Sequence, residues 1–163
     1  MTANKIGDPT TLNRLYGRSK GKKLRAGQAN LVDTLLPQIA VPAEGPVTAD
    51  GLFGGDIPLH FEIGFGGGEH LIEAAAAEPD VDFIGCEPFI NGMAKFLAVI
   101  EREGLTNIRI WDGDAALMLP RLPAGSLDAI DLLYPDPWPK RRQRKRRFVS
   151  DRTLGLFART LRP

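Results

Sequence analysis

The feature that most constrains the fold of this chain is a regular alternation of strand and helix patterns that begins at Pro58. Short apolar runs with strand character are each followed by a stretch with apolar residues at helical spacing. Because strands that alternate with helices form parallel βαβ units, the sequence predicts an α/β fold, a Rossmann-like doubly wound and mostly parallel sheet with helices on both faces. Strands are predicted at 58–64, 81–87, 107–114 and 127–135, and helices at 70–78, 90–103, 115–119 and 152–161.

Two domains are predicted, with a boundary after residue 57. Residues 1–57 form a basic N-terminal extension with one helix over 26–39, whose residues Leu31, Leu35 and Leu36 share a face and whose end is marked by Pro37. Residues 58–163 form the Rossmann-like domain. Four strands are few for such a sheet, and the fourth would leave an open parallel edge. We therefore expect a fold that is incomplete at its C-terminus.

The net charge of +1 hides a strong asymmetry. Residues 14–25 carry six Lys or Arg and no acid, and residues 140–147 carry seven and no acid. The rest of the chain keeps 8 of the 21 basic residues against all 20 acidic ones, a balance of −12. An acidic body with two basic segments favours a polyanionic partner, although solvated charge runs would give the same composition.

Composition also bears on the compartment and on metals. Cys86 is the single cysteine, so no internal disulfide can form, and no Cys/His cluster suggests a metal site. No apolar run resembles a signal peptide or approaches the about 18 residues of a membrane helix. We expect a cytoplasmic protein without metal or membrane partner; the sequence does not specify its oligomeric state.

A glycine loop follows the first predicted strand, in the segment EIGFGGG at residues 62–68. A dinucleotide-binding fingerprint G-x-G-x-x-G read from Gly64 would need a third glycine where Glu69 stands. The pattern E-x-G-x-G-x-G is instead typical of methyltransferases that use S-adenosylmethionine, whose sulfonium and ammonium groups favour nearby carboxylates. A glycine-rich turn without a ligand is the alternative. The predicted cofactor-binding residues of the loop are Glu62, Gly64, Gly66 and Gly68.

Further acids follow the next two predicted strands. Glu87 lies 23 residues after Gly64, near the offset at which an acid binds ribose hydroxyls in this fold. Asp114 could accept a hydrogen bond from the adenine amine, with Asp112 as the alternative. Since ligands bind at the carboxyl ends of parallel strands, these acids are predicted to join Glu62 at one site.

The fourth predicted strand ends in YPDPWPK, residues 134–140. Three prolines in five residues predict a rigid, extended loop, suited to holding a planar base near a methyl donor. Asp136 lies between two of these prolines, and the basic run KRRQRKRR begins at Lys140. Composition alone also allows a nuclear-targeting interpretation of this run, but its position directly after PDPWP argues against it.

The segment PDPWPKRRQRKRR resembles the signature of the bacterial tRNA (guanine-N7)-methyltransferase family, and EIGFGGGEHL, Glu87 and Asp114-Ala115 match that family in order and spacing. The resemblance implies S-adenosylmethionine as cofactor, tRNA as partner, and methyl transfer to guanine N7 in the variable loop. It implies contacts of Glu62, Glu87, Asp114 and Asp136 with the methyl donor and identifies Asp136 as catalytic. The family has a further substrate-binding region beyond residue 163, and usually a His at Gln143. Ala115 is assigned to the cofactor site, and the predicted RNA-binding residues are Lys140, Arg142, Gln143, Arg144, Lys145, Arg146 and Arg147.

Two other functions remain open at this point: a catalytically inert RNA-binding fragment of such an enzyme, and a methyltransferase acting on a protein or small molecule. Trp138 could stack on a base or pack internally. His60 and His70 are both predicted to be structural, His60 because it lies in a buried strand and His70 because no acidic or Cys partner is evident.

Overall fold

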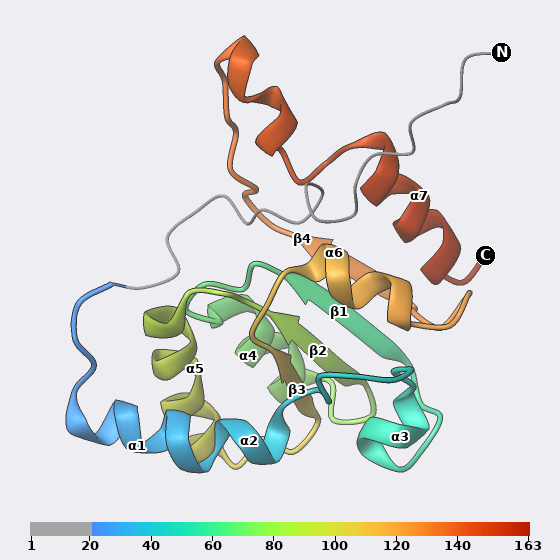
Figure 1. Ribbon diagram of the computed structural model, residues 1–163. Helices are drawn as coiled ribbons and strands as arrows, with labels where there is room; N and C mark the ends of the chain where they lie inside the picture. The colour runs from blue at the N-terminus through green and yellow to red at the C-terminus, as the bar shows by residue number, and fades with distance from the viewer. Residues whose placement is uncertain (1–20) are drawn as a thin grey trace, which may run out of the picture.

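The computed structural model describes residues 21–163, which contain one four-stranded parallel sheet with helices on both faces (Figure 1). The strand order is β3-β2-β1-β4, so the strand sequence reverses between β1 and β4. The predicted fold class is confirmed. The predictions for residues 1–20, which include the first part of the basic stretch at 14–25, concern residues outside the described range. The strands are β1 (Leu59–Ile63), β2 (Asp82–Cys86), β3 (Ile108–Trp111) and β4 (Ala129–Leu132).

The helices after β1 follow the predicted pattern closely. The helix predicted at 90–103 has those bounds, and it ends at Gly104, whose φ of 64° is a left-handed conformation suited to glycine. Its buried residues recur at helical spacing, which made it predictable. The helices of this part are α4 (Glu69–Ala77), α5 (Ile90–Glu103), α6 (Ala115–Met118), the 3-10 helix η2 (Leu119–Arg121), the 3-10 helix η3 (Arg141–Arg146) and α7 (Asp151–Thr160).

The helical stretch predicted at 26–39 is divided in two. It forms α1 (Ala26–Thr34) and α2 (Leu36–Ile39), and a third short helix, α3 (Ala49–Phe53), follows. Pro37 was predicted to mark the end of the helix, but it occupies the first turn of α2. A proline is tolerated there since the first amide groups of a helix have no intrahelical acceptor.

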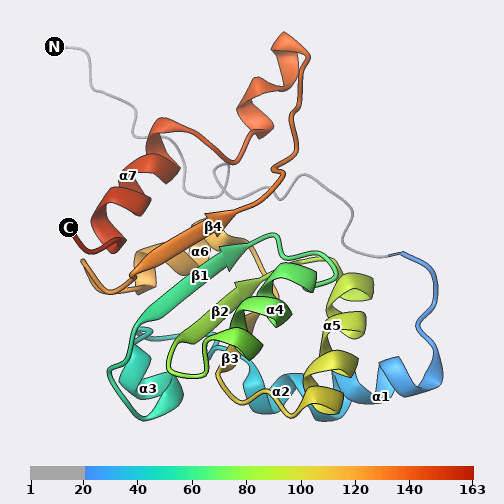
Figure 2. The same cartoon turned by 180° about the vertical axis from the view of Figure 1, so that it is seen from behind.

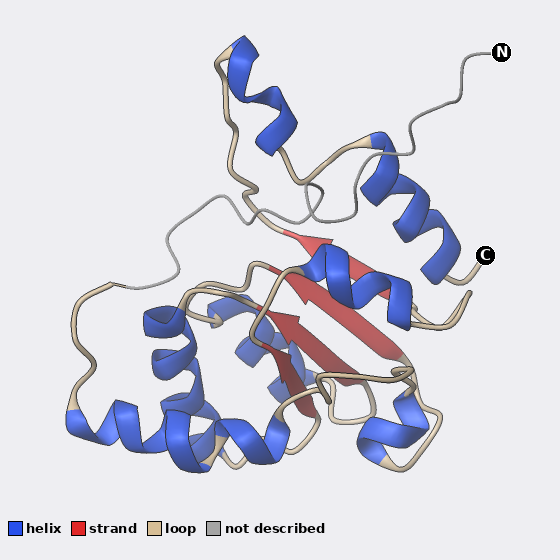
Figure 3. Cartoon of the chain, in the orientation of Figure 1, coloured by secondary structure: helices blue, strands red, loops and turns tan. Residues whose placement is uncertain are grey.

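The sheet separates two apolar clusters, and helices lie over both of its faces (Figure 3). α4 and α5 cover one face and α6 covers the other (Figures 1 and 2). In β1, Leu59, Phe61 and Ile63 pack in the cluster on the α6 side. Because side chains alternate along a strand, His60 and Glu62 of β1 point to the face that α4 covers. This alternation directs Glu62 toward the helix that follows the glycine loop.

The segment before β1 shares the core of the sheet. α1 packs on α5, with Leu31 in the cluster on that face. The Val41 amide donates to the Ile110 carbonyl at 2.8 Å, and Val47, which is 1% exposed, packs in the opposite cluster. The domain boundary after residue 57 stays a prediction.

On the far side of β4, α7 returns the chain toward the beginning of that strand (Figure 1). Leu161 forms a parallel bridge with Leu127, and the Leu127 amide donates to the Thr160 carbonyl at 2.9 Å. Within residues 21–163, the residues Ala129–Leu132 pair only with β1. The outer edge of β4 itself is therefore open in the described part of the chain, as predicted for this strand.

The loop after β4 rises away from the sheet and leads into η3 (Figure 1). Two residues depart from the predicted extended backbone of this loop, because Tyr134 and Trp138 adopt left-handed backbone with φ of 51° and 37°. The sequence also did not predict η3 in the basic run. Left-handed backbone in residues other than glycine costs about 1–2 kcal/mol each, and such strain clusters at functional sites.

Candidate cofactor and substrate site

The glycine loop between β1 and α4 depends on glycine for its conformation. Gly64, Gly66 and Gly68 have φ of 75°, 58° and 80°, which is left-handed backbone that other residues rarely adopt. At Gly68 a β-carbon would also lie 2.1 Å from Phe96 Cδ2 of α5. All three glycines are thus needed for the backbone conformation of the loop, and Gly68 is also needed for close packing against Phe96.

The surroundings of the first two glycines fit a bound ligand. A β-carbon at Gly64 or Gly66 would meet no protein atom within 4 Å, so the space beside these residues is open. A ligand can therefore lie directly against the backbone at the carboxyl end of β1. The three nearby acids, Glu62, Glu87 and Asp114, make a cationic ligand electrostatically favourable.

Glu87, predicted to bind ribose, also braces the glycine loop. Its Oε2 accepts a hydrogen bond from the Gly66 amide at 2.8 Å, and its Oε1 accepts one from the Phe89 amide at 2.8 Å. A carboxylate has about four acceptor sites, so these two bonds leave room for ribose hydroxyls. Glu87 is 8% exposed, and the two backbone bonds fix its orientation before any ligand binds.

Glu62 makes the contact that the sequence analysis missed. His70, the second residue of α4, places Nδ1 2.8 Å from Oε2 of Glu62. The prediction that His70 has no acidic partner is therefore wrong. The signal was the strand–loop–helix order, since the first turn of α4 returns over the end of β1 eight residues after Glu62.

Burial and this hydrogen bond act on both groups. Burial raises the pKa of the Glu62 carboxyl above its ordinary value of 4.5, and the hydrogen bond from His70 partly offsets the increase. The bond with Glu62 raises the pKa of the His70 imidazole above 6.5. The Asp131 carboxylate of β4, which pairs in register with Glu62, raises both values. Negative charge is thus concentrated at the carboxyl ends of β1 and β4.

Asp114 caps α6. Its Oδ1 accepts from the Ala116 amide at 2.8 Å, and its carbonyl accepts from Trp111 Nε1 at 3.1 Å. Oδ2 makes no hydrogen bond with another described residue, so it remains available for an adenine amine. Ala115 is 2% exposed and packs beneath this position. Asp112, the alternative to Asp114, is exposed on the preceding turn.

The residues predicted to bind substrate lie on the raised loop and on η3. Asp136 and Lys140 are exposed, and no hydrogen bond or ion pair to another residue in 21–163 fixes the Asp136 carboxylate. Arg147 donates through Nε to the Pro137 carbonyl at 3.1 Å, and the Arg146 guanidinium lies 4.9 Å from the Trp138 ring centroid. Trp138 therefore packs against its own loop in this structure. The remaining predicted RNA-binding residues are Arg142, Arg144 and Lys145, which are exposed, and Gln143, which is half-buried.

The structure thus brings together the predicted cofactor-binding residues near Glu87, whereas the loop with Asp136 lies apart from them (Figure 1). Hydrogen bonds connect β2, the glycine loop and β3 near Glu87, because the Glu87 amide also donates to the Trp111 carbonyl at 3.1 Å. The loop that carries Asp136 begins at the same sheet edge, since β4 is parallel to β1, but it extends away from it (Figure 1).

A second residue that the sequence analysis missed is Asn91, at the start of α5. Its Oδ1 accepts from the Gly21 amide at 2.7 Å, and its Nδ2 donates to the Lys22 carbonyl at 2.6 Å. These bonds hold the end of the N-terminal basic stretch beside the Glu87–Phe89 turn. A single asparagine in an amphipathic helix gave no signal of this contact.

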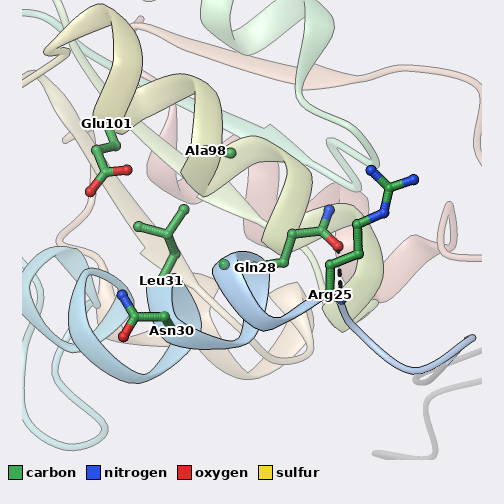
Figure 4. Close-up of a pocket in the computed structure, with 7 residues that line it drawn as sticks. Arg25, Gln28, Asn30, Leu31, Ala98 and Glu101 are labelled. Atoms are coloured by element: carbon green, nitrogen blue, oxygen red, sulfur yellow. Dashed lines mark hydrogen bonds between the residues drawn. The ribbon is translucent and has the colours of Figure 1, made fainter.

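A separate hollow lies between α1 and α5 (Figure 4). Figure 4 shows Glu101 and Ala98 of α5 facing Leu31 and Gln28 of α1. None of the predicted site residues lines it. In the described part of the chain, no group of three His, Cys, Asp or Glu side chains is placed to hold a metal ion. No helix formed by residues 21–163 has the length and apolar character needed to span a membrane.

Comparison with known proteins places this arrangement in a class of enzymes. Residues 56–163 match the family model described as "Putative methyltransferase". The chain is 60% identical over 163 residues to the tRNA (guanine-N(7)-)-methyltransferase of Erythrobacter litoralis, covering all of this chain and 70% of that protein. It is 61% identical over 168 residues to the protein of that name in Sphingopyxis alaskensis, covering all of this chain and 71% of the relative.

Among solved structures, the chain is similar to phosphoethanolamine N-methyltransferase 2 of Haemonchus contortus in complex with S-adenosyl-L-methionine, with a TM-score of 0.47, 16% identity, and coverage of 83% of this chain and 26% of the other. The family model, which matches more than half of the chain, defines a methyltransferase. From its match to the two bacterial relatives, the chain belongs to the tRNA (guanine-N7)-methyltransferase family.

Proposed function

We propose that this chain transfers a methyl group from S-adenosylmethionine to N7 of a guanine in the variable loop of tRNA. The observation that carries the proposal is the glycine loop, open beside Gly64 and Gly66 and surrounded by acids, together with the PDPWP loop at the neighbouring strand end. The tRNA and guanine-N7 specificity follows from the names of the relatives, which are about 60% identical over the whole chain.

The cofactor site consists of residues from three strand ends. Gly64, Gly66 and Gly68 let the cofactor approach the backbone, and Ala115, buried at the start of α6, forms the neighbouring wall of the site. Glu62 contacts the cationic part of the cofactor, Glu87 accepts hydrogen bonds from the ribose, and Asp114 accepts one from the adenine amine through Oδ2. When bound, S-adenosylmethionine supplies an electrophilic methyl group on its sulfonium.

Asp136 acts on the guanine. Guanine N7 is an acceptor with a free lone pair, so its attack on a methyl carbon needs no prior deprotonation and no strong general base. The Asp136 carboxylate accepts hydrogen bonds from the N1–H and the N2 amine of the base, which orients N7 and stabilises the positive charge that develops on the ring. The left-handed residues Tyr134 and Trp138 on either side of Asp136 support a specialised role for this loop.

The basic run binds the tRNA backbone. Lys140, Arg142, Arg144 and Lys145 are exposed, and their side chains make no hydrogen bond with another described residue, so they are available for phosphates. Gln143 can hydrogen-bond RNA. Arg146 and Arg147 hold the PDPWP loop through Trp138 and Pro137, and they contact RNA beside this loop. A tRNA substrate places the protein in the cytoplasm. The N-terminal extension, residues 1–57, adds the basic stretch at 14–25 as a further contact for RNA, while α1 packs on α5 of the methyltransferase domain.

The test is transfer of labelled methyl groups from S-adenosylmethionine to unmodified tRNA, followed by identification of the product nucleoside. We expect 7-methylguanosine from the wild-type chain and at least about a hundredfold lower rate from Asp136→Ala, with nearly unchanged tRNA affinity. A matched control is Asp151→Ala, which removes an exposed acid from the start of α7. A collapse of tRNA affinity in Asp136→Ala would contradict its role, and tRNA binding without any transfer would favour an inert RNA-binding protein.

A further inference from the structure

We propose that His70 is a positioning residue of the cofactor site: its Nδ1–H holds the Glu62 carboxylate in place and leaves Oε1 for the ammonium group of S-adenosylmethionine. The inference rests on the proposed function, because it assigns Glu62 a cationic ligand. It adds a residue to the site that the glycine-loop pattern does not include.

The geometry of the pair supports this role. Glu62 is 4% exposed, and its Oε2 is taken by His70 Nδ1 at 2.8 Å. Oε1 makes no hydrogen bond with any other residue in the described range. Oε1 is also not among the fully buried atoms that lack a partner in the described range, so water reaches it and an N–H group of a ligand can take the place of that water. The free oxygen is therefore the one that a cofactor can use.

His70 suits this task because of its position on α4. As the second helical residue it is anchored by the helix, while half of its side chain reaches solvent. Nδ1 can carry a proton in both the neutral and the charged imidazole, so the hydrogen bond to Glu62 does not depend on the charge of His70. An Asn at this position retains an N–H donor, and a Phe retains a ring without one.

Three acids face the imidazole. Glu62 lies at the end of β1, Asp131 lies on β4, and Glu73 lies one turn further along α4. Each of them favours the protonated imidazole. Burial favours protonated Glu62, whereas the hydrogen bond from His70 favours the carboxylate. Loss of the donor therefore raises the pKa of Glu62 further, so that the negative charge that the cofactor requires is present over a narrower pH range.

The test measures binding of S-adenosylmethionine by calorimetry between pH 5 and pH 8.5 for the wild type, His70→Phe and His70→Asn. We expect His70→Phe to weaken binding about tenfold at pH 7 and to lose affinity at a higher pH than the wild type as the solution is acidified. His70→Asn should bind within about twofold of the wild type. Unchanged affinity and pH profile in His70→Phe would overturn the proposal, as would equal losses in both variants, which indicate a packing role.

Proton NMR gives an independent readout without cofactor. The chain has two histidines, so His60→Gln assigns both imidazole signals. We expect His70 to titrate above 6.5 in the wild type and closer to 6.5 in Glu62→Gln. Identical titration in the two proteins would overturn the pairing. If the pair is present but the wild type binds no S-adenosylmethionine at any pH, then the proposed function fails together with the assigned role of Oε1.

Discussion

At the scale of single residues, Glu62 combines a functional position with a cost in stability. Its carboxylate is buried at the end of β1, and burial raises its pKa above 4.5. A group with a raised pKa in the folded state stabilises the protein below its unfolded pKa, and this contribution is lost as the pH rises through the folded value. At neutral pH the ionised Glu62 therefore lowers the free energy of unfolding of the cofactor-free protein.

Glu62→Gln should remove this cost. We expect the cofactor-free variant to be more stable than the wild type at pH 8, and the difference to vanish at pH 4, where Glu62 is largely protonated. Urea unfolding at both values measures the effect. A stability difference that is the same at pH 4 and pH 8 would contradict the electrostatic cause. The same variant should bind S-adenosylmethionine more weakly, since it lacks the negative charge.

Gly68 is the position in the glycine loop where a side chain is least tolerated. It combines a φ of 80° with a β-carbon position 2.1 Å from Phe96 Cδ2. We expect Gly68→Ala to lower the free energy of unfolding by about 2–4 kcal/mol, from backbone strain and overpacking. Gly155→Ala is the control, because this glycine lies within α7 with open space around it, and alanine there should stabilise by up to about 1 kcal/mol. Equal effects at the two positions would refute the packing argument.

At the scale of elements, η3 is the part of the structure best placed to contact RNA. Replacement of Arg141, Arg142, Arg144 and Lys145 by Gln leaves Arg146 and Arg147 to hold the loop. We expect tRNA affinity to fall at least about tenfold at 0.1 M salt and the slope of log affinity against log salt to decrease by about 3. Filter binding across a salt series measures both.

The control for this variant is Lys95→Gln with Arg102→Gln, which removes two exposed positive charges from α5. It should change affinity and slope little, because α5 lies outside the proposed RNA surface. An equal loss of binding free energy per removed charge in the two variants would mean that binding follows net charge and not η3.

Elements with a periodic pattern could be predicted from the sequence, and elements without one could not. α5 was predicted with its observed bounds because its apolar residues face one core and Gly104 ends it. η3 has no apolar face, since six consecutive residues are charged or polar, so nothing in the run indicated a 3-10 helix. The left-handed residues Tyr134 and Trp138 were also unexpected. Each precedes a proline, which fixes its own φ but only biases the residue before it toward extended backbone.

At the scale of the whole molecule, one part of the site could be predicted from the sequence and another part could not. The pattern of acids and glycines predicted which residues gather at the carboxyl ends of β1, β2 and β3, because parallel strands align these ends. The His70–Glu62 bond is a tertiary contact between a strand end and a helix start. The strand–loop–helix order brings the two residues near each other, but the residue pattern does not specify the bond. The loop with Asp136 extends from the same edge, but its distance from the glycine loop depends on contacts that sequence spacing does not specify.

The charge distribution joins the two halves of the proposed function. The acidic body favours the cationic cofactor, and the basic run on η3 favours the polyanionic tRNA. The two proposed binding surfaces share the sheet edge where the PDPWP loop leaves β4 beside β1, and the loop then extends away from that edge (Figure 1). In the proposed reaction, guanine N7 receives the methyl group at this edge of the sheet.

The most direct test replaces a single atom of the substrate. Two tRNAs are compared, one with ordinary guanosine and one with 7-deazaguanosine at the variable-loop position, where carbon takes the place of N7. We expect methyl transfer from S-adenosylmethionine to the first tRNA and none to the second, with similar affinity for both. Equal transfer to the two tRNAs would contradict the account, because the acceptor would then be another atom.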